Sequence, residues 1–249
     1  MLLDGWVLRF AKGFTKRANS IVPLYITESE TAPPSDERLL AKIRYCENLY
    51  AREQLTTVFR LTSINQALHE PTSATSNPAA STAARLDALL ADRGYELAER
   101  NFVLACDLDT SPGAAGTSEL HMVSLDQWLS AYCRITGMDE PARTLHGYIL
   151  RAISGECGFA LLMRNNEPVA CGLAVLEREL VGLFDVVTAP AHRRRGHSRE
   201  LLNNIFVWAR ERGAQRAYLQ VVRDNDAALA LYGQLGFSHC YDYWYRIAP

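Results

Sequence analysis

The sequence predicts a mixed α/β protein made of two successive halves, and three observations lead to this expectation. Apolar residues follow a helical spacing in some segments and form short continuous runs in others, so helices and strands alternate. The length of 249 residues fits one large domain or two modest ones. A stretch of small residues and proline at 107–118 separates two patterned regions. We therefore expect a domain over 1–106, a linker over 107–118 and a second domain over 119–249.

The first half is predicted to contain two helices among strands. Between residues 36 and 53, apolar side chains are expected on one side of a helix, at Leu39, Leu40, Ile43, Cys46 and Tyr50. Residues 69–82 are rich in Ser, Thr, Pro and Ala without an apolar period, which is typical of a loop. The predicted elements are strands at 5–10 and 18–25, a helix at 36–53, a strand at 57–61, a helix at 84–93 and a strand at 95–106.

In the second half, the same signals give the order α-α-β-β-β-α-β-α-β. Residues 125–136 carry apolar side chains at helical spacing, and a break at 139–141 precedes the next helix. A turn at 165–168 joins two strands as a hairpin. The strand at 181–188 is apolar nearly throughout, so we expect it in the middle of the sheet. The predicted elements are helices at 125–136 and 142–153, strands at 159–163, 169–177 and 181–188, a helix at 198–212, a strand at 217–222, a helix at 226–235 and a strand at 237–245.

Composition and charge exclude several classes of protein. Hydrophobic residues make up 48% of the chain and charged residues 22%, which is ordinary globular usage. With 26 basic and 28 acidic side chains, the net charge of −2 offers no basic surplus for nonspecific nucleic-acid binding. No apolar run is long enough for a membrane helix, and the start of the chain lacks the pattern of a signal peptide. We therefore expect a cytoplasmic protein without a membrane or nucleic-acid partner.

The cysteines and histidines do not form a metal-binding pattern. The six cysteines include no Cys-x-x-Cys pair, and the six histidines show no zinc-ligand spacing. His192 and His197 flank an arginine run that would repel a cation. We expect reduced, mostly buried thiols and no metal site.

A loop rich in arginine joins the strand at 181–188 to the helix at 198–212. It runs from Pro190 to Ser198 and contains three consecutive arginines followed by Gly196. The N-terminus of a helix offers unpaired backbone N–H groups and the positive end of the helix dipole, and a glycine lets the backbone close around an anion. Arginines add bidentate contacts to phosphate. The segment suits a pyrophosphate, whereas the simpler interpretation is a solvated charge cluster at a strand end.

The segment 185–198 resembles the acetyl-CoA-binding core of the GCN5-related N-acetyltransferases (the GNAT family). The family pattern, V-x-P and then R/Q-x-x-G-x-G/A, is matched at Pro190, Arg193 and Gly196, and the sequence departs from it at Thr188 and Ser198. A second signature, N-x-x-A-x-x-L-Y-x-x-x-G-F, is matched from 225 to 237. The resemblance covers roughly half of the chain, from about residue 120 onward. It implies an α/β fold with a mixed α+β sheet, the acetyl-CoA N-acyltransferase (GNAT) fold.

The resemblance assigns the cofactor site to this loop and to the strand before it. Backbone N–H groups of 194–198 are expected to hold the pyrophosphate of coenzyme A, and the strand backbone is expected to pair with the pantetheine arm. A bulge is expected to separate this strand from the next near 219–221, which leaves a gap for the acetyl thioester. A backbone N–H at Val187 or Thr188 is expected to polarise the thioester carbonyl. The expected cofactor-binding residues are Val186, Val187, Thr188, Arg193, Arg194, Arg195, Gly196, His197, Ser198 and Asn225.

Two residues are candidates for catalytic proton transfer. Tyr232 matches the general-acid tyrosine of the family, which protonates the leaving thiolate, although its spacing alone is typical of a core residue. Asp185 lies in an apolar run and resembles the acidic base of some family members, so it is the candidate base for the acceptor amine. A pairing of Asp185 with a neighbouring arginine is equally consistent with the sequence. Glu177 and Glu179 are weaker candidates for the base. Asn225 matches a residue that contacts the pantetheine or supports the helix that carries Tyr232.

The first half looks like a degenerate, partial copy of the second, which predicts a tandem pseudo-repeat. Its element order repeats the last part of the second half, and the pair at 94–95 echoes the Gly-Phe pair at 236–237. Leu90 stands where Tyr232 stands, and no Arg-x-x-Gly loop precedes the helix at 36–53. We therefore expect the first half to bind no acetyl-CoA, and to cover the sheet and shape the acceptor pocket.

The sequence thus predicts an enzyme, an acetyl-CoA-dependent N-acetyltransferase. The acetyl group is expected to move from the thioester to a primary amine by direct attack in a ternary complex. The alternative is a noncatalytic acyl-CoA-binding sensor or interaction protein, which needs neither Tyr232 nor Asp185. The expected partners are acetyl-CoA as co-substrate and a small-molecule or peptide amine. A polyamine, an amino acid, an antibiotic amine and a protein N-terminus all remain open, as do a longer acyl donor and the oligomeric state.

Overall fold

The computed structural model describes residues 1–24, 34–63, 78–109 and 120–249. These residues fall into two units: unit 1 contains Met1–Phe102 and Tyr241–Pro249, and unit 2 contains Val103–Cys240. The last nine residues, which the sequence places in the second half, belong to unit 1 because the final strand pairs with a strand of the first half. Most of the expected linker at 107–118 lies outside the described residues.

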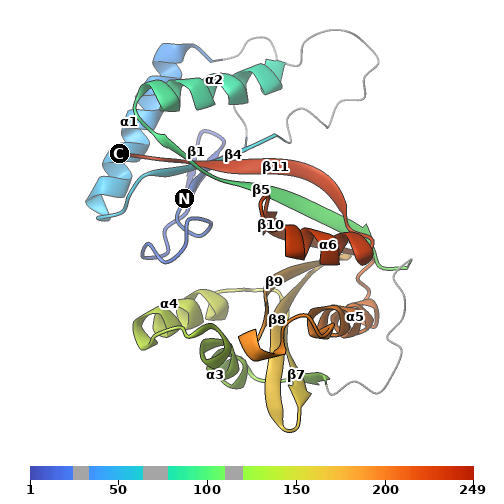
Figure 1. Cartoon of the computed structure of the whole chain (residues 1–249). Helices are drawn as coiled ribbons and strands as arrows, with labels where there is room; N and C mark the ends of the chain where they lie inside the picture. Colours follow the sequence, from blue (N-terminus) through green and yellow to red (C-terminus); the bar gives the residue numbers. More distant parts are fainter. Residues whose placement is uncertain (25–33, 64–77, 110–119) are drawn as a thin grey trace. The chain divides into compact units, whose positions relative to one another are not determined.

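Unit 1 is a sheet packed against two helices. Its strand order is β1-β2-β3-β4-β11, and β4 and β11 are antiparallel, with Thr62 opposite Tyr243. Figure 1 shows α1 and α2 on one side of these strands, where Tyr50, Phe59, Leu86 and Leu90 form a fully buried core. The elements are β1 (Leu2–Leu3), β2 (Trp6–Leu8), β3 (Ile21–Pro23), α1 (Asp36–Arg52), β4 (Val58–Thr62), α2 (Pro78–Asp92) and β11 (Ser238–Ile247).

Unit 2 has helices on both faces of its sheet. Its strand order is β10-β9-β8-β7-β6, antiparallel throughout except for the parallel pair of β9 and β10. In Figure 1, α3 and α4 cover one face and α5 covers the other. The elements are β6 (Leu120–Met122), α3 (Leu125–Thr136), α4 (Glu140–Arg151), β7 (Glu156–Arg164), β8 (Glu167–Glu177), β9 (Leu180–Thr188), α5 (His197–Arg210), β10 (Arg216–Val222) and α6 (Asp226–Gln234). β5 (Glu96–Asp107) and β11 contribute residues to both units.

Most predicted elements are present with ends shifted by a few residues. The predicted hairpin is β7–β8, and its turn residues Asn165 and Asn166 have φ of 51° and 64°, as a tight two-residue hairpin turn requires. The strand expected in the middle of the sheet is β9, which lies between β8 and β10. The two-residue β1 and three-residue β6 were not predicted.

One predicted loop is partly helical. Residues 78–82 were expected in the loop at 69–82, but they form the first turns of α2; residues 69–77 lie outside the described residues. Pro78 opens the helix, a position where its missing N–H has no intrahelical partner to lose. The low apolar content of these residues concealed the helix start, since the sequence prediction depended on an apolar stripe.

The helix ends that suggested an internal repeat have the same local geometry. In unit 1, the N–H of Tyr95 donates to the carbonyl of Leu90 at 3.0 Å after a glycine with φ of 83°. In unit 2, the N–H of Phe237 donates to the carbonyl of Tyr232 at 3.0 Å after a glycine with φ of 85°. The same bond follows a left-handed glycine at the ends of α3 and α5, from Met138 to Cys133 and from Ala214 to Ala209, so this geometry is a common helix end and the pseudo-repeat stays a prediction here.

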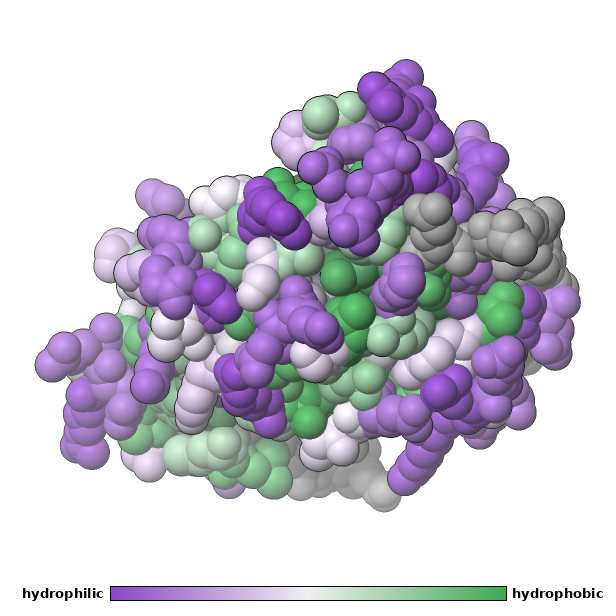
Figure 2. Space-filling view, turned by 90° about the horizontal axis from the view of Figure 1, so that it is seen from below, coloured by the Kyte–Doolittle hydropathy of each residue, from purple (hydrophilic) through white to green (hydrophobic). Residues whose placement is uncertain are grey.

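Hydrophilic residues cover most of the face drawn in Figure 2, with hydrophobic surface exposed between them. Within the described ranges, no helix is long and apolar enough to span a membrane.

Candidate functional site

A β-bulge interrupts β9 at Asp185. Cys171 of β8 faces Val187 of β9, and Leu173 faces Phe184, so the single residue between them, Gly172, faces two residues of β9. Asp185 has φ of 50°, a left-handed conformation that Asp tolerates better than most residues. Such bulges bend a strand and re-aim a side chain, often beside active sites.

The bulge coincides with the point where β9 and β10 stop pairing. Their parallel ladder runs from Leu180 and Arg216 to Leu183 and Leu219, and then ends although both strands continue. Residues 181–183 of β9 are buried, whereas 184–188 are all half-buried. The separation of the two strands expected near 219–221 is therefore present, and it exposes one edge of β9 for the length of an extended ligand.

The arginine loop forms an anion-binding geometry at the end of β9. Pro190–His192 make a single 3₁₀ turn, and α5 begins at His197. Arg194 and Gly196 have φ of 64° and 81°, and left-handed residues in such a turn aim successive N–H groups into one concavity. No side chain caps α5, so the N–H groups of its first turn are open to a ligand. A Cβ on Gly196 would meet nothing within 4 Å, so the constraint on this position is backbone conformation.

Charged side chains surround this loop. The three consecutive arginines are exposed, and Arg193 Nε donates to the carbonyl of Thr188 at 3.4 Å. Arg164 of β7 pairs with Glu200 of α5. Burial, together with the nearby Arg164, lowers the pKa of His197, which keeps this imidazole neutral at physiological pH. These residues fit a group with several negative charges, as the sequence predicted for coenzyme A.

The two residues that depart from the family pattern are hydrogen-bonded to each other. Thr188 ends β9 and Ser198 lies in the first turn of α5, and their Oγ1 and Oγ atoms are 2.7 Å apart. The bond therefore closes the loop between residues 188 and 198 at its two ends. Valine with glycine or alanine, the residues of the family pattern, could not make this contact.

Tyr232 and Asn225 belong to α6. Tyr232 is 9% exposed and packs edge-on against Phe237, with ring centroids 5.7 Å apart. Burial raises the pKa of its phenol, so the hydroxyl holds its proton well above neutral pH. Asn225 caps the helix, because its Oδ1 accepts from the N–H of Ala228 at 3.2 Å. The structure thus shows Asn225 supporting the helix of Tyr232; contact with pantetheine stays a prediction.

Asp185 pairs with a histidine that the sequence analysis did not single out. The Nε2 atom of His146, on α4, lies 3.0 Å from Asp185 Oδ2. The alternative partner considered from sequence, a neighbouring arginine, is not the group in this contact. The signal was hidden because the two residues are 39 positions apart and meet only when α4 packs on the sheet. Glu177 ends β8 and Glu179 precedes β9, so both lie at the far end of β9 from the arginine loop, and both are exposed.

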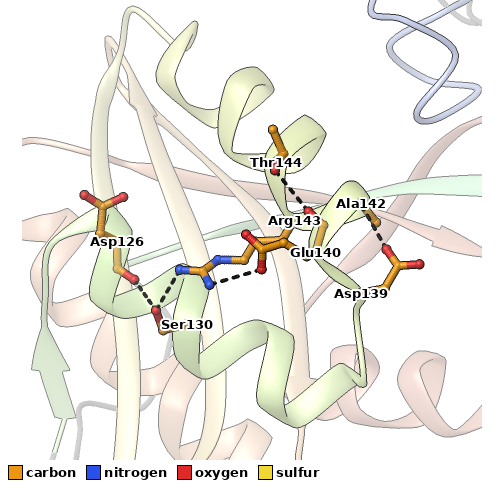
Figure 3. A network of polar contacts seen from close by, with 7 residues as sticks. All are labelled: Asp126, Ser130, Asp139, Glu140, Ala142, Arg143 and Thr144. Atoms are coloured by element: carbon orange, nitrogen blue, oxygen red, sulfur yellow. Dashed lines mark hydrogen bonds and ion pairs between the residues drawn. The ribbon is translucent and has the colours of Figure 1, made fainter.

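Polar contacts hold α3 and α4 together beside this pair (Figure 3). Arg143 of α4 contacts Glu140 one turn earlier and donates to Ser130 Oγ of α3 at 3.2 Å. Ser130 in turn donates to the carbonyl of Asp126 at 2.8 Å. Outside the residues drawn in the figure, Arg151 of α4 reaches the Asp126 carboxylate at 2.5 Å. The network fixes α4 against α3, and so fixes the helix that carries His146.

Comparison with known proteins identifies the family. The family described as "Probable histone acetyltransferase Rv0428c C-terminal" matches residues 1–246, nearly the whole chain. The chain belongs to this acetyltransferase family. It is thereby a GCN5-related N-acetyltransferase, as its motifs indicated, and the predicted enzyme class is confirmed at the level of the family.

Relatives of this GNAT protein cover both units. It is 26% identical over 247 residues to an uncharacterized N-acetyltransferase, YobR, of Bacillus subtilis, covering 97% of this chain and 89% of the relative. A GCN5-related N-acetyltransferase from Kribbella flavida shares the fold with a TM-score of 0.65 at 18% identity, over 93% of this chain and 82% of that one. A tandem GNAT protein from the clavulanic acid biosynthesis pathway matches with a TM-score of 0.56 at 13% identity, over 92% and 75%. The predicted GNAT fold is therefore confirmed.

Proposed function

We propose that the protein transfers an acetyl group from acetyl-CoA to a primary amine at one site in unit 2. The observation that carries this proposal is the uncapped start of α5 behind a loop with left-handed residues and three arginines, directly after the bulged end of β9. This arrangement offers backbone donors and positive charge to a pyrophosphate, and an open strand edge to an extended arm. Bound acetyl-CoA supplies an activated acyl group as a thioester.

The residues of the site have separate roles in this proposal. The N–H groups of 194–198 and the side chains of Arg193 and His197 hold the phosphates. The open edge of β9 at 186–188 holds the pantetheine arm, and one of its N–H groups polarises the thioester carbonyl. Asn225 keeps α6 in place. Asp185 accepts a proton from the acceptor ammonium, and Tyr232 donates one to the departing sulfur.

The atoms balance in this reaction. A C–N bond forms to the amine and the C–S bond of the thioester breaks. Two protons leave the ammonium nitrogen, and one proton ends on the sulfur, so one proton is released to solvent. The raised pKa of Tyr232 suits the donor role, because the phenol is still protonated when the thiolate leaves.

Unit 1 is proposed to be a degenerate copy without its own site. Leu90, at the position equivalent to Tyr232, is fully buried in the core of unit 1 and offers no proton. The tandem arrangement proposed for this chain is similar to that named for the clavulanic acid protein. The role of unit 1 in shaping the acceptor pocket rests on the sequence analysis and stays a proposal.

The test is Tyr232→Phe, with Tyr45→Phe as the matched control because Tyr45 is exposed on α1. Turnover of acetyl-CoA is measured by thiol release with polyamines, amino acids, aminoglycosides and peptides as acceptors. We expect Tyr232→Phe to lower kcat by about 100-fold with unchanged acetyl-CoA affinity, the usual effect of removing a general acid. Unchanged turnover would remove Tyr232 from the mechanism. Acetyl-CoA binding without thiol release from any acceptor would favour the noncatalytic sensor.

A further inference from the structure

A buried histidine faces the candidate base from the helical layer of unit 2. The His146 side chain is 8% exposed, whereas the Asp185 side chain is 29% exposed. An ionised carboxylate has no hydrogen to donate, so Nε2 of His146 carries the proton in the 3.0 Å contact with Oδ2. The imidazole thus donates to Oδ2 of Asp185, and the other carboxylate oxygen, Oδ1, is the one that we assign to a further group.

Aromatic residues of α3 fix the orientation of this imidazole. The ring of His146 lies edge-on to Trp128, with centroids 6.1 Å apart, and to Tyr132, with centroids 5.1 Å apart. Trp128 and Tyr132 stack on each other at 4.8 Å. Trp128 Nε1 also donates to the carbonyl of Gly172 at 3.1 Å, and Gly172 is the residue that faces the bulge. The same indole therefore touches both the histidine and the strand opposite Asp185.

The backbone at Asp185 points to the same conclusion. A positive φ is unfavourable for a residue with a Cβ, by about 1–2 kcal/mol, and such outliers gather at functional sites. The bulge directs the carboxylate out of the regular strand face, at the place where β9 and β10 separate.

We propose that His146 is a positioning residue that holds the Asp185 carboxylate ready to take a proton from the acceptor ammonium. This inference rests on the proposed acetyl transfer. The proton moves from the ammonium nitrogen to Asp185, where the contact with Nε2 stabilises the carboxylate before transfer, and it passes to solvent after the amide has formed. No other bond changes in this step.

Two other titratable side chains lie close to the pair of His146 and Asp185. The titratable groups that face it from the packed elements are Tyr132 of α3 and Cys171 of β8. Burial and the charge of Asp185 raise the pKa of Tyr132, and they raise the pKa of Cys171 to about 12. Both groups therefore stay neutral near physiological pH, and the charge that the acceptor meets comes from Asp185.

Two variants of His146 separate positioning from packing. His146→Gln keeps an N–H donor near the position of Nε2, and His146→Phe keeps a ring against Trp128 but removes the donor. In turnover with an acceptor amine found for the wild type, we expect Asp185→Asn to lower kcat by about 100-fold. We expect His146→Phe to lower it by about tenfold, the effect of losing one hydrogen bond to a charged group. His146→Gln should stay within about threefold of the wild type, and all three should bind acetyl-CoA normally.

Non-additivity is the decisive readout. In the double variant with Asp185→Asn, the change His146→Phe should cause no further loss, because it acts through the carboxylate. A further tenfold loss in the double variant, or normal turnover of His146→Phe alone, would overturn the proposal. Equal losses in the Gln and Phe variants would also overturn it, since packing rather than the donor would then matter.

A spectroscopic measurement tests the pair without an acceptor. In the full chain labelled with ¹⁵N-histidine and held at one neutral pH, His146 Nε2 should give the signal of a protonated ring nitrogen, and that signal should shift in Asp185→Asn, because the group on the other side of the 3.0 Å contact changes. A signal that is the same in both proteins would show that the two side chains are not in contact and would overturn the inference. Failure of the wild type to bind acetyl-CoA would instead contradict the proposed function, which this spectrum does not require.

Discussion

The hydrogen bond between Thr188 and Ser198 predicts that two substitutions compensate each other. Thr188→Val and Ser198→Ala each remove one hydroxyl and leave the other without its 2.7 Å partner. The double variant removes both hydroxyls and restores the residues of the family pattern. Each single variant should therefore weaken acetyl-CoA binding, and the double variant should bind no worse than either single one.

The magnitude follows from one hydrogen bond at a half-buried position. Such a bond contributes about 1 kcal/mol, and about 1.4 kcal/mol corresponds to a tenfold change in affinity. Both residues are half-buried, so water can replace part of the lost interaction. Because the bond closes the loop that carries the N–H donors, its loss lowers the fraction of protein in the binding-competent loop conformation. We expect each single variant to raise the Kd for acetyl-CoA by about threefold to fivefold.

Calorimetric titration with acetyl-CoA measures this coupling directly. Thr188→Ser is the matched control, because it keeps the hydroxyl and should bind like the wild type. The coupling free energy from the four proteins should be about 1 kcal/mol. Effects that simply add in the double variant would refute the reasoning, as would a Thr188→Ser variant as weak as Thr188→Val.

Three further predictions concern stability and pH. Gly182→Ala should lower Tm by several degrees, because its Cβ would lie 2.7 Å from side-chain atoms of Phe184 and Tyr218. Gly233→Ala is the control, because a Cβ there meets nothing within 4 Å, and thermal unfolding compares the two variants. Burial raises the pKa of Asp87, but hydrogen bonds from Arg246 and from the indole of Trp244 outweigh burial, and the pKa is lowered. The ion pair of Asp87 with Arg246 therefore stabilises unit 1 fully above about pH 4, the ordinary pKa of aspartate, and this stabilisation is lost as the pH falls through the lowered pKa. Asp87→Asn should therefore be less stable than the wild type in urea unfolding at pH 7, with a difference that shrinks below pH 4. The fall of kcat at alkaline pH should begin above about pH 10, because burial raises the pKa of Tyr232. A fall of kcat that begins near pH 8 would contradict the role of Tyr232 as the general acid.

The cofactor loop was predictable because all its determinants are local. The strand end, the arginines, Gly196 and the helix start follow one another within a dozen residues. The helix at 125–136 was predicted with its exact ends for a similar reason. Ser124 and Gln127 form a capping box at its start, and Gly137 closes its end in a left-handed conformation.

The proton-transfer pair could not be predicted in full, since it depends on tertiary contacts. No residue near Asp185 in the sequence predicts its positive φ, because the bulge arises from the register of β9 against β8. In the sequence, His146 is one polar residue of an amphipathic helix, and its contact with Asp185 forms only when α4 packs on the sheet. The assignment of β11 to unit 1 is non-local as well, since it pairs with β4 from the other end of the chain.

The most direct test of the central claim is calorimetric titration of the full chain with acetyl-CoA, together with Gly196→Ala and Gly213→Ala. These two glycines have left-handed φ values of 81° and 89° and lie at opposite ends of α5, and a Cβ on either one would meet nothing within 4 Å. The backbone strain is thus matched, and only Gly196 lies in the proposed phosphate loop. We predict one site per chain, weakened about tenfold or more in Gly196→Ala and unchanged in Gly213→Ala. No binding by the wild type, two sites per chain, or equal losses in both variants would contradict the account.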